Sequence, residues 1–359
     1  MNYLLSQALA WKYQHLIKPL FFLCDPESVH NFMTQIGRAL GSNSVTKEVT
    51  RLLLAHQNSK LNKTIDGISF SNPVGLSAGF DYNGDLTQIL PAVGFGFQTI
   101  GTVTWQPYEG NPKPRLGRFP NSKALLVNKG LKSLGAQAII KELEPLTFEV
   151  PIGISIAATN RYYQTTREQM LDILQSFSAF ENSHVKHSYY ELNISCPNTF
   201  GGEPFTSPSR LDLLLRVIDK LKLSRPIYIK MPIDQSEAET LELLNVIDRH
   251  QVQGVIIGNL TKDKNSPDIN EVDRERWLHS PGNLSGKPTW QRSNNLIALT
   301  KKQYGDRFTI IGCGGIFSGE DAHTKMKLGA DLVQLITGMI YQGPQLIGQI
   351  NHYLTITKF

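Results

Sequence analysis

Residues 193–198, Asn-Ile-Ser-Cys-Pro-Asn, close a run of β-forming residues and carry groups suited to proton transfer from a small ring. The amides of Asn193 and Asn198 offer both donors and acceptors to a planar polar ring. Cys196 could accept a proton, although a free thiol has a pKa of about 8.5 and needs close contact with an activated C–H. An isolated cysteine is more often a small buried hydrophobic residue. The flanking asparagines favour the catalytic interpretation.

Two glycine-containing segments suit an anion, because glycine lets backbone N–H groups approach a ligand closely. They are residues 312–315, Gly-Cys-Gly-Gly, and the pair Thr337-Gly338, and each follows an apolar run. Ordinary tight turns are the alternative interpretation. Since the two segments end consecutive apolar runs near the C-terminus, we predict that together they bind phosphate.

Lys230 ends the apolar run 226–229, and Asn259 ends the next run along the chain. A charge is costly inside a core, so the ammonium of Lys230 either extends outward or pairs with an anion. Combined with the glycine segments, these two residues describe a pocket for an anionic, aromatic cofactor above a hydrogen-bonding substrate site.

The polar residues follow eight short apolar runs, each of which leads through a polar loop into a helix-like stretch. We expect strands at Gly75–Phe80, Phe97–Val103, Pro151–Ala157, Tyr189–Ser195, Pro226–Met231, Gly254–Gly258, Thr309–Gly312 and Leu332–Ile336. Helical patterns between them include Pro208–Leu221, Ser236–His250 and Gln291–Tyr304. This alternation predicts an α/β fold, a (β/α)8 TIM barrel, with the polar residues at one mouth. A doubly wound open sheet is the alternative, but no Gly-x-Gly-x-x-Gly follows the first strand.

Residues 1–60 differ from the barrel segment, residues 61–359. Apolar residues fall at helical spacings before residue 24, and a second helical pattern begins at Asp25-Pro26. We therefore expect an N-terminal helical extension. Periodicity leaves two interpretations open: a helix pair that plugs the bottom of the barrel, or a lid whose apolar face meets lipid or a lipid-soluble partner.

The composition excludes several classes of protein. With 40% hydrophobic and 19% charged residues, the 359-residue chain can bury a large core. The net charge of +5 is spread without a run of five like charges, so we expect no nucleic-acid partner. Three widely spaced cysteines fit neither a disulfide framework nor a metal site. Lacking a membrane span or a secretory signal, the chain is expected to be cytoplasmic, peripherally associated with a membrane.

Six segments closely resemble dihydroorotate dehydrogenases. They are Asn72–Asp81, Ile100–Thr104, Gly110–Arg115, Asn193–Asn198, Leu284–Pro288 and Gly312–Ile316. Asp25–His30 resembles the helical extension of the membrane-associated, quinone-dependent type, class 2. The resemblance covers nearly the whole chain. It implies FMN as cofactor, dihydroorotate as substrate, quinone as electron acceptor and a place in pyrimidine biosynthesis.

The resemblance also implies roles for individual residues. Cys196 would be the base, and Lys230 would stabilise negative charge on the reduced flavin. His30 and Arg118 would lie near the quinone path. The FMN-binding residues would be Ala78, Gly79, Thr102, Ser155, Asn193, Lys230, Gly258, Gly286, Gly314, Gly315, Thr337 and Gly338. The substrate-binding residues would be Tyr82, Asn128, Lys129, Gly130, Asn193, Asn198, Asn259 and Leu260.

The chain departs from the family pattern at several of these positions. Cysteine replaces serine at position 196, Tyr82 replaces a lysine, Val127 an asparagine and Leu260 a threonine. On the flavin side, Ser155, Gly258 and Ile336 replace an asparagine, a threonine and a tyrosine. These changes keep two alternatives open: a divergent paralogue that acts on the C–C bond of another small ring, and a flavin-binding protein without turnover.

Overall fold

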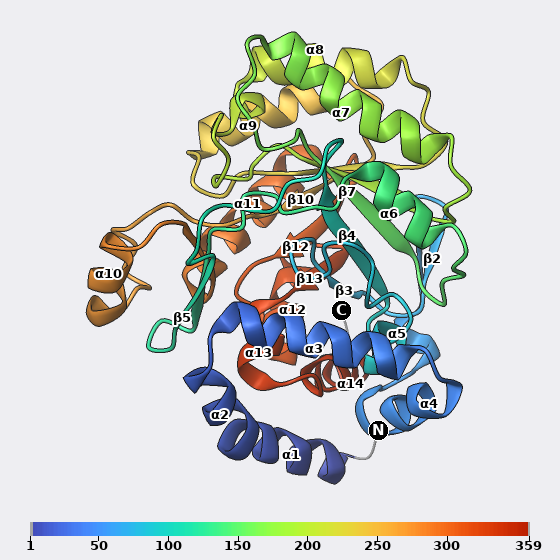
Figure 1. Cartoon of the computed structure of the whole chain (residues 1–359), viewed down its shortest axis with the longest axis vertical. Coiled ribbons are helices and arrows are strands. Elements are labelled where there is room, and N and C mark those ends of the chain that lie inside the picture. The colour runs from blue at the N-terminus through green and yellow to red at the C-terminus, as the bar shows by residue number, and fades with distance from the viewer. Residues whose placement is uncertain (1–2, 358–359) are drawn as a thin grey trace.

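A computed structural model describes residues 3–357, and its centre is a closed barrel of eight parallel strands (Figure 1). The strands run in the order β10-β12-β13-β3-β4-β7-β8-β9 around the barrel. Their bounds are β3 Val74–Leu76, β4 Phe97–Val103, β7 Ile152–Ile156, β8 Tyr189–Asn193, β9 Ile227–Lys230, β10 Gly254–Ile257, β12 Thr309–Cys313 and β13 Leu332–Leu335. The predicted TIM barrel is confirmed, and the open-sheet alternative is wrong. Residues 1–2 and 358–359 of the two predicted segments lie outside the described residues.

Helices follow the strands, and most of them bury one face against the barrel. Their bounds are α5 Leu90–Val93, α6 Ala136–Leu143, α7 Thr166–Glu181, α8 Pro208–Asp219, α9 Glu237–Ile247, α10 Glu271–Leu278, α11 Trp290–Tyr304, α12 Gly319–Lys327, α13 Thr337–Gln342 and α14 Leu346–Ile356. Local sequence sets where they begin. In α9, for example, Ser236 and Glu239 form a reciprocal capping box.

The bottom of the barrel is closed by a hairpin and a layer of aromatic rings. Strands β1 (Lys63–Ile65) and β2 (Ile68–Phe70) form the hairpin, whose Asp66 carboxylate accepts a hydrogen bond of 2.8 Å from the Tyr228 hydroxyl. Above it, Phe97, Tyr189 and Tyr228 pack together with almost no exposed surface. This end of the barrel is therefore solid, and only the opposite end can hold a ligand.

A small antiparallel sheet covers part of the mouth and was not predicted from the sequence. It consists of β5 (Leu116–Phe119), β6 (Ala124–Val127) and β11 (Asn283–Gly286), with β6 in the centre. The sheet places residues 127–130 and Gly286 beside the carboxyl ends of the barrel strands.

The N-terminal helices lie over the mouth and not at the bottom. They are α1 (Tyr3–Lys12), a π-helical segment (Tyr13–Ile17), α2 (Lys18–Leu23), α3 (Pro26–Gly41) and α4 (Ser44–Leu54). Figure 1 shows α1, α2 and α3 in blue beside α13 and α14. The Tyr13 hydroxyl donates to the Ile340 carbonyl at 2.6 Å, which joins the π-helical segment to α13. Among residues 3–357, no helix combines the length and apolar character needed to cross a bilayer.

The aromatic layer at the bottom yields a stability prediction. A Cβ atom added at Gly153 would overlap the ring of Tyr189, whereas one added at Gly201 would meet only the Gln169 amide at 4.0 Å. Overpacking a closed core costs about 1–3 kcal/mol. We expect Gly153→Ala to lower the free energy of unfolding in urea by that amount, with Gly201→Ala within about 1 kcal/mol of wild type. Equal effects of the two substitutions on the free energy of unfolding would show that the aromatic layer rearranges to accept the added methyl group, which contradicts a closely packed bottom of the barrel.

Candidate functional site

One cavity of about 310 Å³ occupies the mouth of the barrel and extends under the N-terminal helices. Its volume lies at the lower end of the range for small-molecule sites. It brings together most of the predicted site residues. Those that line it are His30, Ala78, Gly79, Tyr82, Thr102, Arg118, Lys129, Gly130, Asn193, Cys196, Asn198, Lys230, Gly258, Asn259, Leu260, Gly286, Gly314, Gly315, Thr337 and Gly338.

A buried polar network forms the floor of this cavity. The Lys230 ammonium donates to the Ser77 hydroxyl at 3.0 Å and lies 3.7 Å from the Glu191 carboxylate. Glu191 also accepts from Ser155 at 2.7 Å, and the Ser155 hydroxyl lies 3.0 Å from that of Thr102. Ser155, predicted to bind cofactor, is thus not part of the cavity lining. Its side chain lies one layer deeper and orients Thr102, because it points into the barrel from the middle of β7.

Side-chain amides that follow β8 and β10 lie beside this floor, and each is held by hydrogen bonds. The Asn193 side-chain nitrogen donates to the Thr102 hydroxyl at 2.9 Å. The Asn193 side-chain oxygen accepts from the Asn259 side-chain nitrogen at 3.4 Å. The Asn198 oxygen accepts from Asn283 at 2.8 Å. Side chains fixed in this way present their remaining donors and acceptors in set directions, as recognition of a planar ring requires.

Cys196 is partly exposed to the cavity, between the amides of residues 193 and 198. Burial raises the pKa of its thiol to about 11, although the backbone of Asn198 and the charge of Lys230 act in the opposite direction. The thiol is therefore mostly protonated at neutral pH. It can act as a base only as the thiolate, whose fraction increases with pH.

The glycine segments form a surface from which side chains are absent. Gly314 and Gly315 adopt φ angles of 107° and 72°, which favour glycine. A Cβ added at Gly315 would come within 2.6 Å of Trp290, and one added at Gly338 would overlap the Ile316 carbonyl. Only glycine fits at these positions, so a ligand in this part of the cavity would contact the backbone directly. This donor set suits a phosphate ester.

A buried ion cluster joins α3 to the mouth of the barrel. The Glu27 carboxylate lies 2.5 Å from the Lys129 ammonium and 3.4 Å from the Arg115 guanidinium, and Glu27 and Lys129 are 5% and 4% exposed. Burial opposes ionisation of Glu27, but the hydrogen bond and charge of Lys129 outweigh it and lower the carboxyl pKa. The Lys129 ammonium also lies 5.2 Å from the ring of Tyr82. Because two cations share one carboxylate, the cluster carries a net positive charge.

The register of residues 127–129 explains why one predicted residue does not face the cavity. In extended backbone, alternate side chains point to opposite sides. Val127 and Lys129 line the cavity, whereas the Asn128 side chain turns away and accepts a hydrogen bond of 2.9 Å from Asn111. Asn128, predicted to bind substrate, therefore supports the loop from behind.

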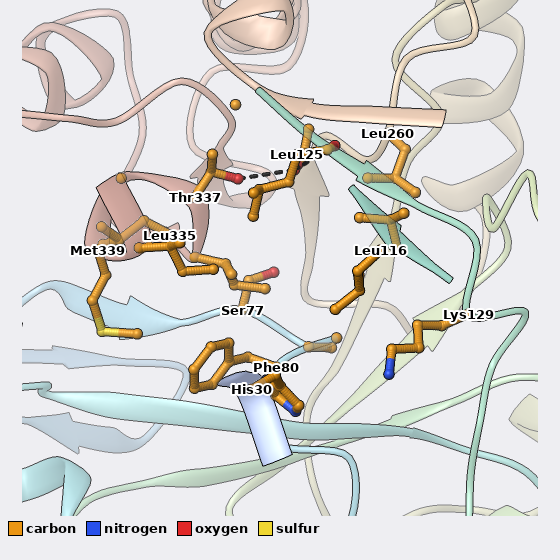
Figure 2. A pocket seen from close by; sticks show the side chains of 18 of the residues that line it. His30, Ser77, Phe80, Leu116, Leu125, Lys129, Leu260, Leu335, Thr337 and Met339 are labelled. Carbon is orange, nitrogen blue, oxygen red and sulfur yellow. Dashed lines mark hydrogen bonds between the residues drawn. The ribbon is translucent and has the colours of Figure 1, made fainter. Parts of the chain in front are cut away.

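An apolar wall lies opposite the polar floor. Figure 2 shows Leu116, Leu125 and Leu260 on one side of the cavity and Phe80 and His30 on the other, with Lys129 at the edge. The His30 ring packs edge-on against Phe80 at 4.9 Å. Burial lowers the pKa of His30 to about 4, so its imidazole is neutral at pH 7.

The remaining arm of the cavity runs between the N-terminal helices. The Arg118 guanidinium lies 4.8 Å from the ring of Phe22 and donates to the Cys24 carbonyl at 2.7 Å. The lining residues that the sequence did not single out for the site include Tyr13, Phe21, Phe22, Val29, Met33, Ser77, Leu116, Leu125, Ser285 and Met339. Most are apolar, and nothing in the sequence separated those that face the cavity from ordinary core residues. Glu27 was also not predicted as a site residue. Its position in the first turn of the helix that begins at Asp25-Pro26 was the available signal in the sequence.

The fold and the site define a barrel protein with a cavity at its mouth, covered by a helical extension. Comparison with known proteins agrees with this description. The family profile described as dihydroorotate dehydrogenase matches residues 60–356. The chain therefore belongs to the dihydroorotate dehydrogenase family.

Individual relatives match over most of their length. Proteins named dihydroorotate dehydrogenase (quinone) from Thermosynechococcus vestitus and Christiangramia forsetii are 33% and 34% identical to the chain. The alignments cover 94% of this chain in both cases and 94% and 97% of the relatives. A crystal structure of the Eimeria tenella enzyme in complex with ferulenol has the same fold, with a TM-score of 0.80 at 24% identity, covering 92% of this chain and 90% of that one.

The ion cluster yields a prediction about stability. Glu27→Gln leaves the buried Lys129 ammonium without its carboxylate, and loss of one partner of a buried pair costs about 3–5 kcal/mol. We expect Glu27→Gln to lower the free energy of unfolding by that amount in urea, and adding Lys129→Met to restore part of the loss.

The matched control is the exposed pair Arg38–Asp85, in which Arg38 is 65% exposed. Asp85→Asn should cost less than about 1 kcal/mol. A cost for Glu27→Gln no greater than that for Asp85→Asn would contradict the structural role of the cluster.

Proposed function

We propose that this chain is an FMN-dependent dihydroorotate dehydrogenase of the quinone-dependent type. The observation that carries the proposal is that one cavity is lined by the glycine segments, Lys230, the three asparagines and Cys196 together. The names of the curated relatives, dihydroorotate dehydrogenase (quinone), support the same substrate and acceptor.

The glycine segments and the floor residues suit FMN. Gly314, Gly315 and Gly338 would hold the phosphate, and Lys230 would offer positive charge to the flavin ring. The chemistry that FMN supplies when bound is acceptance of a hydride from C6 of the ring and delivery of two electrons to a quinone. Lys230 is kept in place for this purpose by Ser77 and Glu191.

The asparagines and Cys196 would handle the substrate. Asn193, Asn198 and Asn259 would hold the pyrimidine ring flat, with C5 toward Cys196. The Cys196 thiolate would take the C5 proton and become the thiol, while the C6 hydrogen leaves as hydride, so that a C=C bond forms and two electrons leave the ring. Because burial raises the Cys196 pKa, only a small fraction is thiolate at pH 7.

Lys129 would supply the cation that the family places at position 82. Lys129 lines the cavity beside Tyr82, and the charge of its cluster with Glu27 and Arg115 is net positive. A substrate carboxylate could therefore pair with Lys129 while Arg115 remains near Glu27. Tyr82 and Lys129 would together replace the lysine that other family members have at position 82.

A second candidate, oxidation or reduction of another small ring, is favoured by one observation. Tyr82, Val127 and Leu260 all line the cavity where the family pattern has hydrogen-bonding groups. A flavin-binding protein without turnover is less consistent with the site, because binding alone requires neither the Cys196 thiol nor the Lys230 ammonium beside it.

The proposal is tested first by the colour of the protein. Purified full-length protein should contain one FMN per chain, and dihydroorotate should bleach the flavin absorbance under anaerobic conditions. Bleaching by other dihydropyrimidines, but not by dihydroorotate, would select the second candidate. A protein that takes up no flavin even from excess FMN would overturn both.

The role of Cys196 is tested by substitution and by pH. Cys196→Ala should slow flavin reduction about 10²–10⁴-fold while FMN stays bound, because the thiol contacts substrate and not cofactor. With the pKa raised by burial, the wild-type rate of flavin reduction in stopped flow should rise steadily from pH 7 to pH 9. A plateau below pH 8, or an alanine variant of normal rate, would exclude Cys196 as the base.

The N-terminal helices would carry the quinone path and the membrane contact. Tyr13, Phe22 and Met33 line the arm of the cavity near His30 and Arg118. On the outer surface, Leu20 and Leu23 are 65% and 85% exposed, and they do not line the cavity. Exposed apolar side chains on an amphipathic surface insert into the boundary of a bilayer. The chain would accordingly be a peripheral membrane protein.

Membrane contact is tested by charging this surface. Leu20→Glu with Leu23→Glu should weaken binding to phosphatidylglycerol vesicles at least about tenfold, since burial of each leucine contributes roughly 1.5–3 kcal/mol. Leu213→Glu on α8, at a leucine that is 53% exposed, is the matched control. Reduction of a soluble dye should be unchanged in all variants. Equal vesicle binding by the double variant and the control would contradict the assignment of this surface.

A further inference from the structure

Lys325, on α12, is a fully buried lysine that the proposed chemistry does not use. Its side chain has no exposed surface, and its ammonium donates to the Ser293 hydroxyl at 2.8 Å and to the Asn294 amide oxygen at 2.9 Å. It also lies 4.7 Å from the Trp290 ring. Among residues 3–357, no carboxylate lies within ion-pair distance of it. Burying such a charge is costly, so the position calls for a compensating role.

The contacts of Lys325 lead directly to a glycine segment. Ser293, which accepts from Lys325, donates in turn to the backbone carbonyl of Cys313 at 2.6 Å. The side-chain carbons of Lys325 pass behind the same strand end, 3.1 Å from the position of a Cβ at Gly312. Lys325 and Ser293 therefore support the end of β12 from the side away from the cavity.

The geometry of the peptide bond gives this support a direction. The bond between Cys313 and Gly314 is trans, so its C=O and N–H point in opposite directions. The Cys313 carbonyl accepts from Ser293 on α11 and from the N–H of Gly258 at 3.2 Å, so the N–H of Gly314 is directed to the other side, toward β13. Gly314 and Gly315, which follow this peptide bond, line the cavity, so their position depends on how the Cys313 carbonyl is held.

We infer that Lys325 and Ser293 are positioning residues for the phosphate of the bound flavin. Lys325 orients the Ser293 hydroxyl, and Ser293 helps to fix the Cys313 carbonyl, which holds the segment Gly314-Gly315 in place beside the phosphate. When Lys325 is protonated, its ammonium adds a positive charge behind the same loop, and an anion in the cavity would stabilise this form. This inference rests on the proposed FMN site and adds to it a group that never touches the cofactor.

The test compares FMN with riboflavin, which has the same ring and no phosphate. Dissociation constants of both flavins are measured for the full-length chain by quenching of flavin fluorescence. Lys325→Met and Ser293→Ala should each weaken FMN binding about tenfold or more, and riboflavin binding less than threefold. Thr300→Val is the matched control, since Thr300 is equally buried on α11 but bonds only within its own helix. It should change neither constant.

The outcomes separate the inference from the proposed function. Equal weakening of FMN and riboflavin, or no weakening in either variant, would overturn the positioning role while leaving the FMN site intact. Failure of the wild-type chain to bind either flavin would overturn both. Because Lys325→Met could impair folding, Ser293→Ala provides the same test with a smaller change, and thermal unfolding identifies a misfolded variant.

Discussion

The arrangement of the mouth depends on one buried carboxylate. Glu27 enters from the first turn of α3 and meets Lys129 and Arg115, which come from the barrel side of the cavity. Breaking a buried ion pair is costly, so this contact holds α3 in its position over the mouth. Tyr82 and the neutral His30 ring pack against the same group. The lid, the cation of the pocket and the start of the apolar arm therefore form one unit.

The barrel separates structural and chemical tasks along its axis. The lower layer is filled with rings, and the upper layer holds the network that runs from Lys230 through Glu191 and Ser155 to Thr102. Buried polar groups are usually hydrogen-bonded, and this network joins side chains from separate strands, although the Glu191 Oε2 oxygen has no hydrogen-bond partner within the described residues. The same separation allows the pocket residues to diverge, because Tyr82, Val127 and Leu260 contribute to the mouth and not to the closed core.

The sequence predicted the eight strands because each is a short apolar run between turn signals, and most site residues because strand ends meet at one mouth. The sheet of β5, β6 and β11 was missed, since its strands are only four residues long and pair across distant segments. Asn128 was wrongly predicted to face the pocket. Which of residues 127–129 face inward depends on the register of β6, and the sequence alone does not give this register. The role of Ser155 depends on depth within the barrel, which periodicity does not report.

The central claim is that Lys129 now serves as the carboxylate-binding cation of the pocket. The most direct measurement is the rate of flavin reduction by dihydroorotate and by dihydrouracil, which lacks the carboxylate, in wild type and in Glu27→Gln/Lys129→Met. Wild type should prefer dihydroorotate, and the double variant should lose about 10–100-fold on dihydroorotate while dihydrouracil is unaffected. An unchanged preference for dihydroorotate in the double variant would contradict the account.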